Sequence, residues 1–442
     1  MRRRSPAPTA PAAPDYDRAV RLYDTYTRGL RELPPPPGPI RIYSCGPTVY
    51  QRIHVGNAVP FVVAMWLRSW LRETGYETKL VINITDINDK IYDAAPGASA
   101  ELATDASGWY VEDTDRLGLG RPDVEPTAVE TVPDQIAMIG ELVARGFAYE
   151  SVGDVYFRVT RFPEYGRLSG QRLDQVEEQE PNPRKEDPRD FALWKATKPG
   201  EDTSWESPWG PGRPGWHIEC SAMSEKHLGP EFEIHGGGLD LVFPHHENEI
   251  AQSRALDHPF AQLWMHNGML TFAGEEMHKS VGNDVSLKGA LDRWGRETLL
   301  TFFLTGHWRK PLEYSDATLE SAAARAEGFR EVFRNASEQA RERAWERFAG
   351  ALDDDFNTAA ALAVMHEWHD HDLLRRALGI FGLETLAEAD SAPAAVAELA
   401  DRRVVARSEK DFVEADRLRG EIEETGWDVR DEADGFRLVR RR

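Results

Sequence analysis

The chain has 442 residues, of which 41% are hydrophobic and 29% are charged, a balance that is typical of folded globular proteins and excludes a largely disordered chain. Its length exceeds that of one ordinary domain, so we expect two or three. The formal net charge of −22 disfavours indiscriminate binding of nucleic acid, although a local basic surface still allows an RNA partner.

The sequence predicts a cytoplasmic protein without a membrane partner. No apolar run approaches the roughly 18 residues that a spanning helix needs, and the N-terminus lacks the apolar stretch of a secretory signal. Residues 1–18 are expected to be a flexible tail, with a transit peptide as the weaker alternative. Only two cysteines occur, Cys45 and Cys220, and in a reducing compartment they are core residues or ligands rather than a disulfide.

The first elements predict a parallel sheet. Residues 40–44 alternate like a strand, apolar residues recur at helical spacing over 57–73, and residues 79–85 form a second apolar strand. A strand, a helix and a strand within fewer than fifty residues make a βαβ unit, which indicates an α/β protein with a Rossmann-type parallel sheet. Neither a G-x-G-x-x-G fingerprint nor a P-loop is present, so a nucleotide would be held in another way.

The rest of the chain predicts two further parts. Residues 146–214 mix strand-like pieces with Pro-rich and charged segments, as an insertion between two halves of a nucleotide-binding fold does. Beyond Ser315, a good N-cap, helical periodicity dominates. We therefore predict a catalytic domain over 19–314 that contains this insertion, followed by an all-α domain over 315–442.

The first motif is His54-Val55-Gly56-Asn57, between the first strand and its helix. A helix N-terminus presents unpaired amides and the positive end of the helix dipole, which suits phosphates, and glycine allows an adenine ring to approach the backbone. An ordinary surface loop is the alternative, because four residues alone are a weak signal.

A richer group of histidines and carboxylates follows. If the residues after Pro244 are helical, His245 and Glu249 lie one turn apart on one face, at a spacing that suits two metal ligands. Cys220, and Cys45 from the first strand, could complete the site. Any single histidine here is more commonly a satisfied polar residue, but the coincidence with both cysteines favours zinc. The group comprises residues 216–220, 235–240 and 244–249.

The third motif is the polar loop 276–283, which contains Lys279 and Ser280. A lysine in a loop beside a nucleotide site can neutralise charge that develops on a phosphate. By itself it is an ordinary polar loop.

Together and in this order, the segments resemble the cysteinyl-tRNA synthetase family from about residue 19 to the C-terminus. The matching strings are residues 43–50, 83–86, 212–223 and 235–253. The resemblance implies a class I synthetase with a Rossmann catalytic domain, an inserted connective domain and a helical anticodon-binding domain. Its expected reaction is the ATP-dependent activation of L-cysteine and its transfer to tRNA(Cys), giving Cys-tRNA(Cys), AMP and diphosphate.

The resemblance also implies roles for individual residues. One zinc ion per chain would be held by Cys45, Cys220, His245 and Glu249, and would bind the thiolate of the substrate. Thr85 and Trp216 would line the amino-acid pocket. His54, Asn57 and Lys279 would act in catalysis, and Mg²⁺ would accompany ATP. The ATP-binding residues would be His54, Gly56, Asn57, Met277, His278, Lys279 and Ser280.

Four positions depart from the family pattern. Glu276 stands where the family has a lysine, His278 where it has a serine, Val59 where it commonly has an arginine and Asn88 where it has an aspartate. A negative charge beside a triphosphate would slow activation. Two alternatives therefore stay open: a weakened paralogue that binds tRNA or cysteine, and a ligase that joins cysteine to an amino sugar, which the helical C-terminal part disfavours. We expect a monomer.

Overall fold

The computed structural model describes residues 18–176, 181–272, 275–276, 285–340, 342–388, 392–432 and 435–440. Over these residues no helix has both the length and the apolar character needed to cross a membrane.

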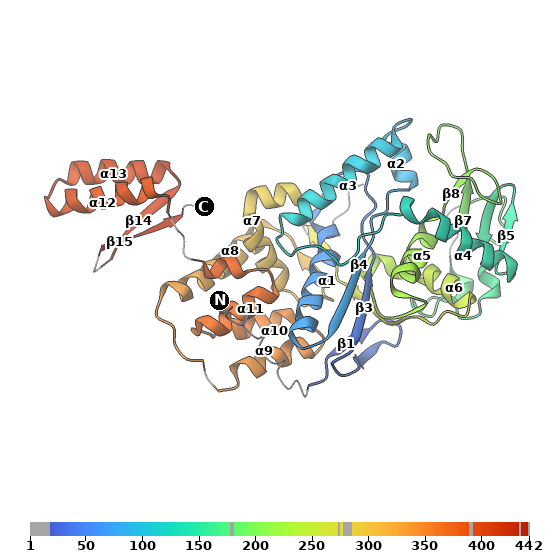
Figure 1. Ribbon diagram of the computed structural model, residues 1–442, viewed down its shortest axis with the longest axis horizontal. Helices are drawn as coiled ribbons and strands as arrows, with labels where there is room; N and C mark the ends of the chain where they lie inside the picture. The colour runs from blue at the N-terminus through green and yellow to red at the C-terminus, as the bar shows by residue number, and fades with distance from the viewer. Residues whose placement is uncertain are drawn as a thin grey trace, which may run out of the picture.

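The centre of the molecule is a four-stranded parallel sheet in the order β10-β9-β3-β4 (Figure 1). The predicted βαβ unit is confirmed, although β4 ends at Ile82, three residues before the predicted end. Beyond it, Ile84 and Thr85 form only isolated bridges, with Thr127 and Thr48. The α/β fold class is therefore established. The elements are β3 (Pro39–Ser44), α1 (Val55–Glu73), β4 (Glu77–Ile82), β9 (Glu231–Gly238) and β10 (Phe260–Asn267).

Helix α1 anchors the sheet to the rest of the chain. It buries an apolar face that includes Trp66 and Trp70, and Gly75 ends the connection to β4 with φ of +92°. Trp66 donates a hydrogen bond through Nε1 to the carbonyl of Phe381, 3.0 Å away, in the helical part of the chain. One large hydrophobic cluster thus spans the sheet, α1 and the helices that follow.

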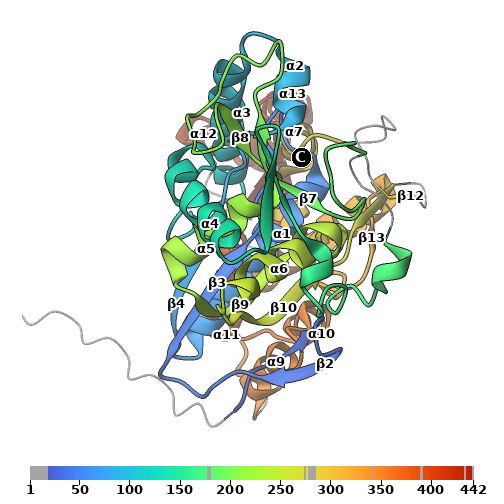
Figure 2. The same cartoon turned by 90° about the vertical axis from the view of Figure 1, so that its right-hand side faces the viewer.

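An antiparallel sheet in the order β5-β6-β7-β8 lies between residues 148 and 214 (Figures 1 and 2). It occupies one end of the molecule, which faces the viewer in Figure 2, and shares a hydrophobic cluster with the side of the central sheet that carries Cys45. Its strands and the helices before it are α2 (Asp89–Ala94), α3 (Ser99–Asp115), α4 (Val132–Ala144), β5 (Ala148–Ser151), β6 (Asp154–Phe157), β7 (Phe191–Ala196) and β8 (Gly212–Pro214).

Further elements complete the catalytic half. A hairpin of β1 and β2 packs against β10, where Asp24 accepts a hydrogen bond from the backbone amide of Trp264 at 2.9 Å. A small sheet in the order β12-β11-β13 takes two strands from before α7 and one from after it. These elements are β1 (Arg21–Asp24), β2 (Gly29–Glu32), α5 (Trp216–Leu228), α6 (Glu247–Ala255), β11 (Leu270–Phe272), β12 (Glu275–Glu276), α7 (Leu287–Leu304) and β13 (Leu312–Glu313).

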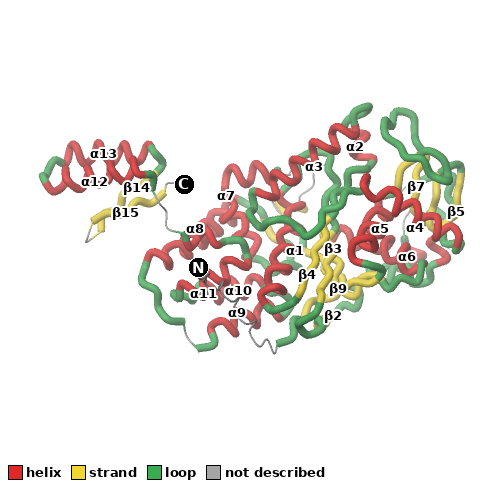
Figure 3. Tube along the Cα trace, in the orientation of Figure 1, coloured by secondary structure: helices red, strands yellow, loops and turns green. Residues whose placement is uncertain are grey.

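Beyond Ser315 the chain is mainly helical, as predicted (Figure 3). Ser315 caps α8 in a capping box with Thr318. The expectation of helices alone misses the last element, a β-hairpin of β14 and β15. With α12 and α13, this hairpin has a small hydrophobic cluster of its own. The elements are α8 (Asp316–Arg334), α9 (Ala344–Asp353), α10 (Thr358–Met365), α11 (His371–Ile380), α12 (Ala394–Ser408), α13 (Phe412–Glu424), β14 (Trp427–Glu432) and β15 (Gly435–Arg440).

Candidate active site and metal centre

The candidate site lies at the carboxyl ends of the parallel strands, where ligands of open α/β sheets bind. Cys45 directly follows β3, and its amide donates to the carbonyl of Gly236 in β9 at 3.0 Å. Gly46 is required next, because a Cβ there would lie 1.7 Å from the carbonyl oxygen of Asn83. The Asn83 side chain in turn accepts from the amide of Gly46 at 3.0 Å. The backbone around Cys45 is therefore fixed from both neighbouring strands.

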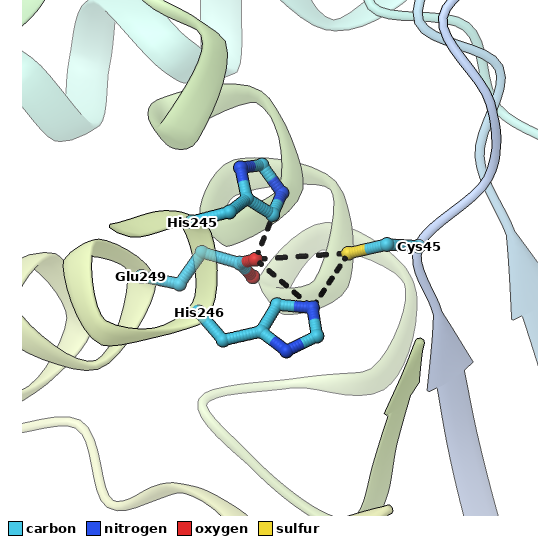
Figure 4. Close-up of side chains that lie close together, drawn as sticks. All are labelled: Cys45, His245, His246 and Glu249. Carbon is cyan, nitrogen blue, oxygen red and sulfur yellow. Dashed lines mark hydrogen bonds and ion pairs between the residues drawn. The ribbon is translucent and has the colours of Figure 1, made fainter. Parts of the chain in front are cut away.

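Cys45, His245, His246 and Glu249 converge in the buried interior (Figure 4), with one ligand atom from each within 4.8 Å of the others. His245 and His246 end the segment Val242–His246, which is kinked at Phe243 and leads into α6, the helix that carries Glu249. His245 Nε2 lies 3.1 Å from Glu249 Oε1, so the predicted i, i+4 pair forms on one face. Cys220, on α5, adds a second sulfur 3.7 Å from that of Cys45.

The donor set fits zinc. Two metal–sulfur bonds of 2.3 Å at the tetrahedral angle place their sulfurs about 3.8 Å apart, close to the separation of the two thiols. Cys45 Sγ and Glu249 Oε1 are likewise 3.7 Å apart. Of the four predicted ligands, Cys45, His245 and Glu249 belong to this group, and Cys220 adjoins it through the contact of its sulfur with that of Cys45. His246 is a fifth donor, with Nε2 at 3.3 Å from the Cys45 sulfur.

A second layer of histidines and aromatic rings holds these donors. His235 Nε2 lies 2.9 Å from Glu249 Oε2, and His217 Nδ1 lies 3.0 Å from His245 Nδ1. Such partners orient metal ligands. His246 Nδ1 lies 2.7 Å from His266 Nε2, whose other ring nitrogen contacts the Thr25 hydroxyl at 2.8 Å.

Burial sets the electrostatics of the cluster. It raises the pKa of the Cys45 and Cys220 thiols and of the Glu249 carboxyl, and it lowers the pKa of His245 and His246 well below the ordinary range. Neutral imidazoles are ready to bind a cation, whereas the thiols need a cation to favour their ionised form.

The predicted amino-acid pocket adjoins this cluster. Trp216, the first residue of α5, stacks on the ring of His245 with a centroid separation of 4.2 Å. Thr85 follows β4 and is linked to the cluster through Asn83, whose Nδ2 donates to the Thr85 hydroxyl at 3.1 Å and whose Oδ1 lies 3.7 Å from the Cys220 sulfur. Glu219 lies beside Thr85, and burial, with Asp86 adding to it, raises its pKa well above the ordinary value.

The predicted nucleotide motif forms the start of α1. His54 is the N-cap, and its Nδ1 accepts a hydrogen bond from the Asn57 amide at 3.3 Å. A Cβ at Gly56 would lie 2.9 Å from the His54 ring, so the glycine makes room for that ring. Val59, one turn on, is buried and lines an apolar pocket with Trp66, and Asn88 caps α2 through the Lys90 amide at 3.1 Å.

The second predicted ATP motif lies outside the described residues, which exclude 277–284 and so Met277, His278, Lys279 and Ser280. The backbone before it is described, and β12 pairs Glu276 with Thr271 of β11. The described backbone therefore ends at β12, directly before this motif.

Sequence reasoning missed several residues of this site. His266 and Asn83 were not singled out for a role, and His235, His246, His217 and Glu219 were noted only within longer strings. The doubled histidine at 245–246 and the Met265-His266-Asn267 segment at the end of β10 are the signals that could have indicated them. Their spacing in the sequence does not predict that these residues meet, because the site is assembled from six separate segments of the chain.

Comparisons with known proteins agree with this geometry. Residues 34–324 match the model of the class I (C) tRNA synthetase catalytic domain, and residues 347–383 match the DALR domain. Cysteine--tRNA ligase of Symbiobacterium thermophilum is 41% identical over 469 residues, covering 95% of this chain and 99% of that protein. Cysteine--tRNA ligase of Halorhodospira halophila is 43% identical over 460 residues, covering 96% and 100%.

A solved structure supports the fold alone. Methionyl-tRNA synthetase of Mycobacterium tuberculosis, in complex with methionyl-adenylate, is 14% identical and superposes with a TM-score of 0.59. The match covers 79% of this chain and 88% of that one.

Proposed function

The chain belongs to the cysteine--tRNA ligase family of class I aminoacyl-tRNA synthetases, and from this premise we propose how its residues select and activate the amino acid. It activates L-cysteine with ATP and transfers it to tRNA, releasing AMP and diphosphate. The observation that carries the proposal is the buried group of two thiols, two imidazoles and a carboxylate at the carboxyl ends of the sheet.

Cys45, Cys220, His245 and Glu249 are the zinc ligands in this proposal. When bound, zinc supplies a position that a thiolate fills far better than a serine hydroxyl does, so cysteine is selected without a hydrolytic editing step. His246 then donates from Nε2 to the Cys45 sulfur across their 3.3 Å separation, in the tautomer in which Nδ1 accepts from His266. The surrounding histidines hold the ligands before the substrate arrives.

Activation needs positioning and charge stabilisation more than covalent help from side chains. Trp216 and Thr85 line the pocket of the amino acid. The carboxylate of the amino acid attacks the α-phosphate of ATP. The start of α1, with His54, Gly56 and Asn57, binds the nucleotide, and Lys279 neutralises the phosphates together with Mg²⁺. The terminal adenosine hydroxyl of the tRNA then attacks the carbonyl of the adenylate.

The proposal extends to the tRNA partner, the oligomeric state and the compartment. The partner is tRNA(Cys), bound in part by the helical region from residue 315 onward, and the protein acts as a monomer in the cytoplasm. A reducing compartment suits the two thiols, which lie 3.7 Å apart without forming a disulfide.

Three measurements on the purified protein test the proposal: bound zinc, cysteine-dependent ATP–pyrophosphate exchange, and charging of tRNA(Cys). One zinc per chain, exchange with cysteine but not serine, and charging are the expected results. Zinc and tRNA binding without exchange would instead identify a non-catalytic paralogue. Exchange with transfer to an amino sugar in place of tRNA would identify the ligase.

A further inference from the structure

A buried carboxyl group in the wall of the amino-acid pocket has no partner. Glu219 lies on α5 between Trp216 and Cys220, and its side chain is fully buried. Among the described residues, neither of its carboxyl oxygens has a hydrogen-bond partner. A buried polar group without a partner costs stability, so its presence calls for an explanation.

The groups that face Glu219 do not neutralise it. They are the Thr85 hydroxyl, the Asp86 carboxylate and the more distant cations of Arg213 and Lys195. Both cations form ion pairs with other carboxylates: Arg213 contacts Asp89 and also Glu201 at 3.2 Å, and Lys195 contacts Asp89 at 2.9 Å. The Thr85 hydroxyl interacts with the carboxyl group and lowers its pKa, although neither carboxyl oxygen has a partner at hydrogen-bond geometry.

The missing partner matches one group of the substrate. Free cysteine carries an ammonium group three bonds from its sulfur, so a sulfur held at the metal cluster places the ammonium in the immediate surroundings of that cluster. Glu219 adjoins the ligand Cys220 in sequence, and Thr85 is linked to Cys220 through Asn83. Helical spacing puts Trp216 and Glu219, three residues apart, on the same side of α5.

We propose that Glu219 is the counter-charge for the α-ammonium group of the bound amino acid and acts beside the Thr85 hydroxyl. This inference rests on the proposed function, because it places the substrate's sulfur at the cluster. The carboxylate of Glu249 is occupied by His235 and His245, at 2.9 and 3.1 Å, which leaves Glu219 as the uncommitted carboxyl of this wall.

Two thiols that differ only in the amino group test the proposal. L-cysteine and 3-mercaptopropionate share the thiol and the carboxylate, and only cysteine carries the ammonium. Their dissociation constants are measured by isothermal titration on the zinc-loaded enzyme and on Glu219→Gln. We expect the variant to bind cysteine about 10- to 100-fold more weakly and to bind 3-mercaptopropionate within about twofold of the wild type. An equal loss for both thiols, or no loss for either, would overturn the proposal.

A control and a second variant complete the experiment. Glu225, on the same helix, contacts His258 at 2.9 Å, and Glu225→Gln makes the same change away from the pocket, so both affinities should stay unchanged. If Glu219→Gln lowers the zinc content or fails to fold, Glu219→Asp keeps the charge on a shorter side chain and should weaken cysteine selectively. Loss of both thiols in Glu219→Asp would contradict the role. Absence of thiol binding and exchange in the wild type would contradict the proposed function itself.

Discussion

At the scale of single residues, the cluster is an unusually dense group of neutral imidazoles. Burial lowers the pKa of His217 and His266 to about 3, and it also lowers the pKa of His245 and His246 well below the ordinary value. Because a histidine kept neutral by burial can bind a metal but cannot readily accept a proton, the cluster is prepared for a cation and sensitive to acid. Two predictions follow from these residues and their ligand neighbours.

Cys220 tests the metal set. Cys220→Ser removes one of two sulfurs and leaves a poorer ligand. Loss of a residue that only orients a ligand lowers metal affinity by about 10- to 100-fold, and we expect Cys220→Ser to lower zinc affinity by more than that. Competition with a chelator measures the affinity. As a control, Ser224 lies one turn further along α5 and donates its hydroxyl to the backbone carbonyl of Ser221 at 3.0 Å, so Ser224→Ala should retain zinc. Full zinc affinity in Cys220→Ser would assign the fourth position to His246.

His266 tests the acid sensitivity. Burial, helped by His235, lowers its pKa from 6.5 to about 3. Below about pH 6.5 the unfolded chain therefore binds a proton at this histidine, whereas the folded protein does not. The stability that the neutral ring contributes is present above pH 6.5 and is lost as the pH falls towards 3. The gap in unfolding free energy between wild type and His266→Gln should change by about 1.4 kcal/mol per pH unit between pH 6 and 5. Urea titrations of both proteins measure it, and a constant gap would contradict the assignment.

At the scale of elements, local sequence signals predicted individual strands and helices correctly, but they did not predict which distant segments pair. Short apolar patterns and capping residues predicted the strand 40–44, the helix after His54 and the start of α8 at Ser315. The β14–β15 hairpin was missed because its six-residue strands lie in a charged segment after two helices. That Cys45 and Cys220 are neighbours depends on the β3–β9 register and on the position of α5, so the sequence could only suggest it as one possibility, which the family resemblance then favoured.

The β1 hairpin shows how one element joins two parts of the molecule. Asp355, after α9, is nearly buried and accepts from the Tyr23 amide of β1 at 2.8 Å and from Arg309 Nε at 2.7 Å. Asp355→Asn should lower the unfolding free energy by about 2–3 kcal/mol, because charged hydrogen bonds are lost at a buried site. Asp354, whose ion pair with Arg21 is exposed on both sides, offers the control, and Asp354→Asn should cost less than about 1 kcal/mol. Equal costs in chemical denaturation would refute this distinction.

Strand β12 contains Glu276, the departure from the family pattern that we expect to affect activity most. Glu276 ends the strand just before the lysine loop and replaces a cation of the family pattern. Glu276→Lys should raise the rate of cysteine-dependent pyrophosphate exchange by about 10- to 100-fold, since one repelling charge becomes an attracting one near the triphosphate. Glu275→Lys adds the same charge one residue earlier and serves as the control. An unchanged rate in Glu276→Lys would show that the position does not face ATP.

At the scale of the whole molecule, the last helices and the final hairpin form a unit with a hydrophobic core of its own. The large cluster joins the catalytic sheet to the helices up to Leu386, whereas α12, α13, β14 and β15 bury their apolar residues in a cluster of their own, to one side in Figure 1. No residue of the metal site comes from this last unit.

A truncation after residue 388 should therefore leave the first step and impair the second. Because the large core is retained, the shortened protein should fold, bind zinc and catalyse cysteine-dependent exchange within about twofold of the full chain, as independent parts of a protein allow. The kcat/KM for charging tRNA should fall by about 10- to 100-fold, because contacts to the RNA backbone are removed while the chemistry is intact. Exchange and charging assays on the same preparations measure both steps. If exchange falls as far as charging, the C-terminal unit supports the catalytic fold, and if charging is unaffected, the tRNA is held by the helices before residue 388.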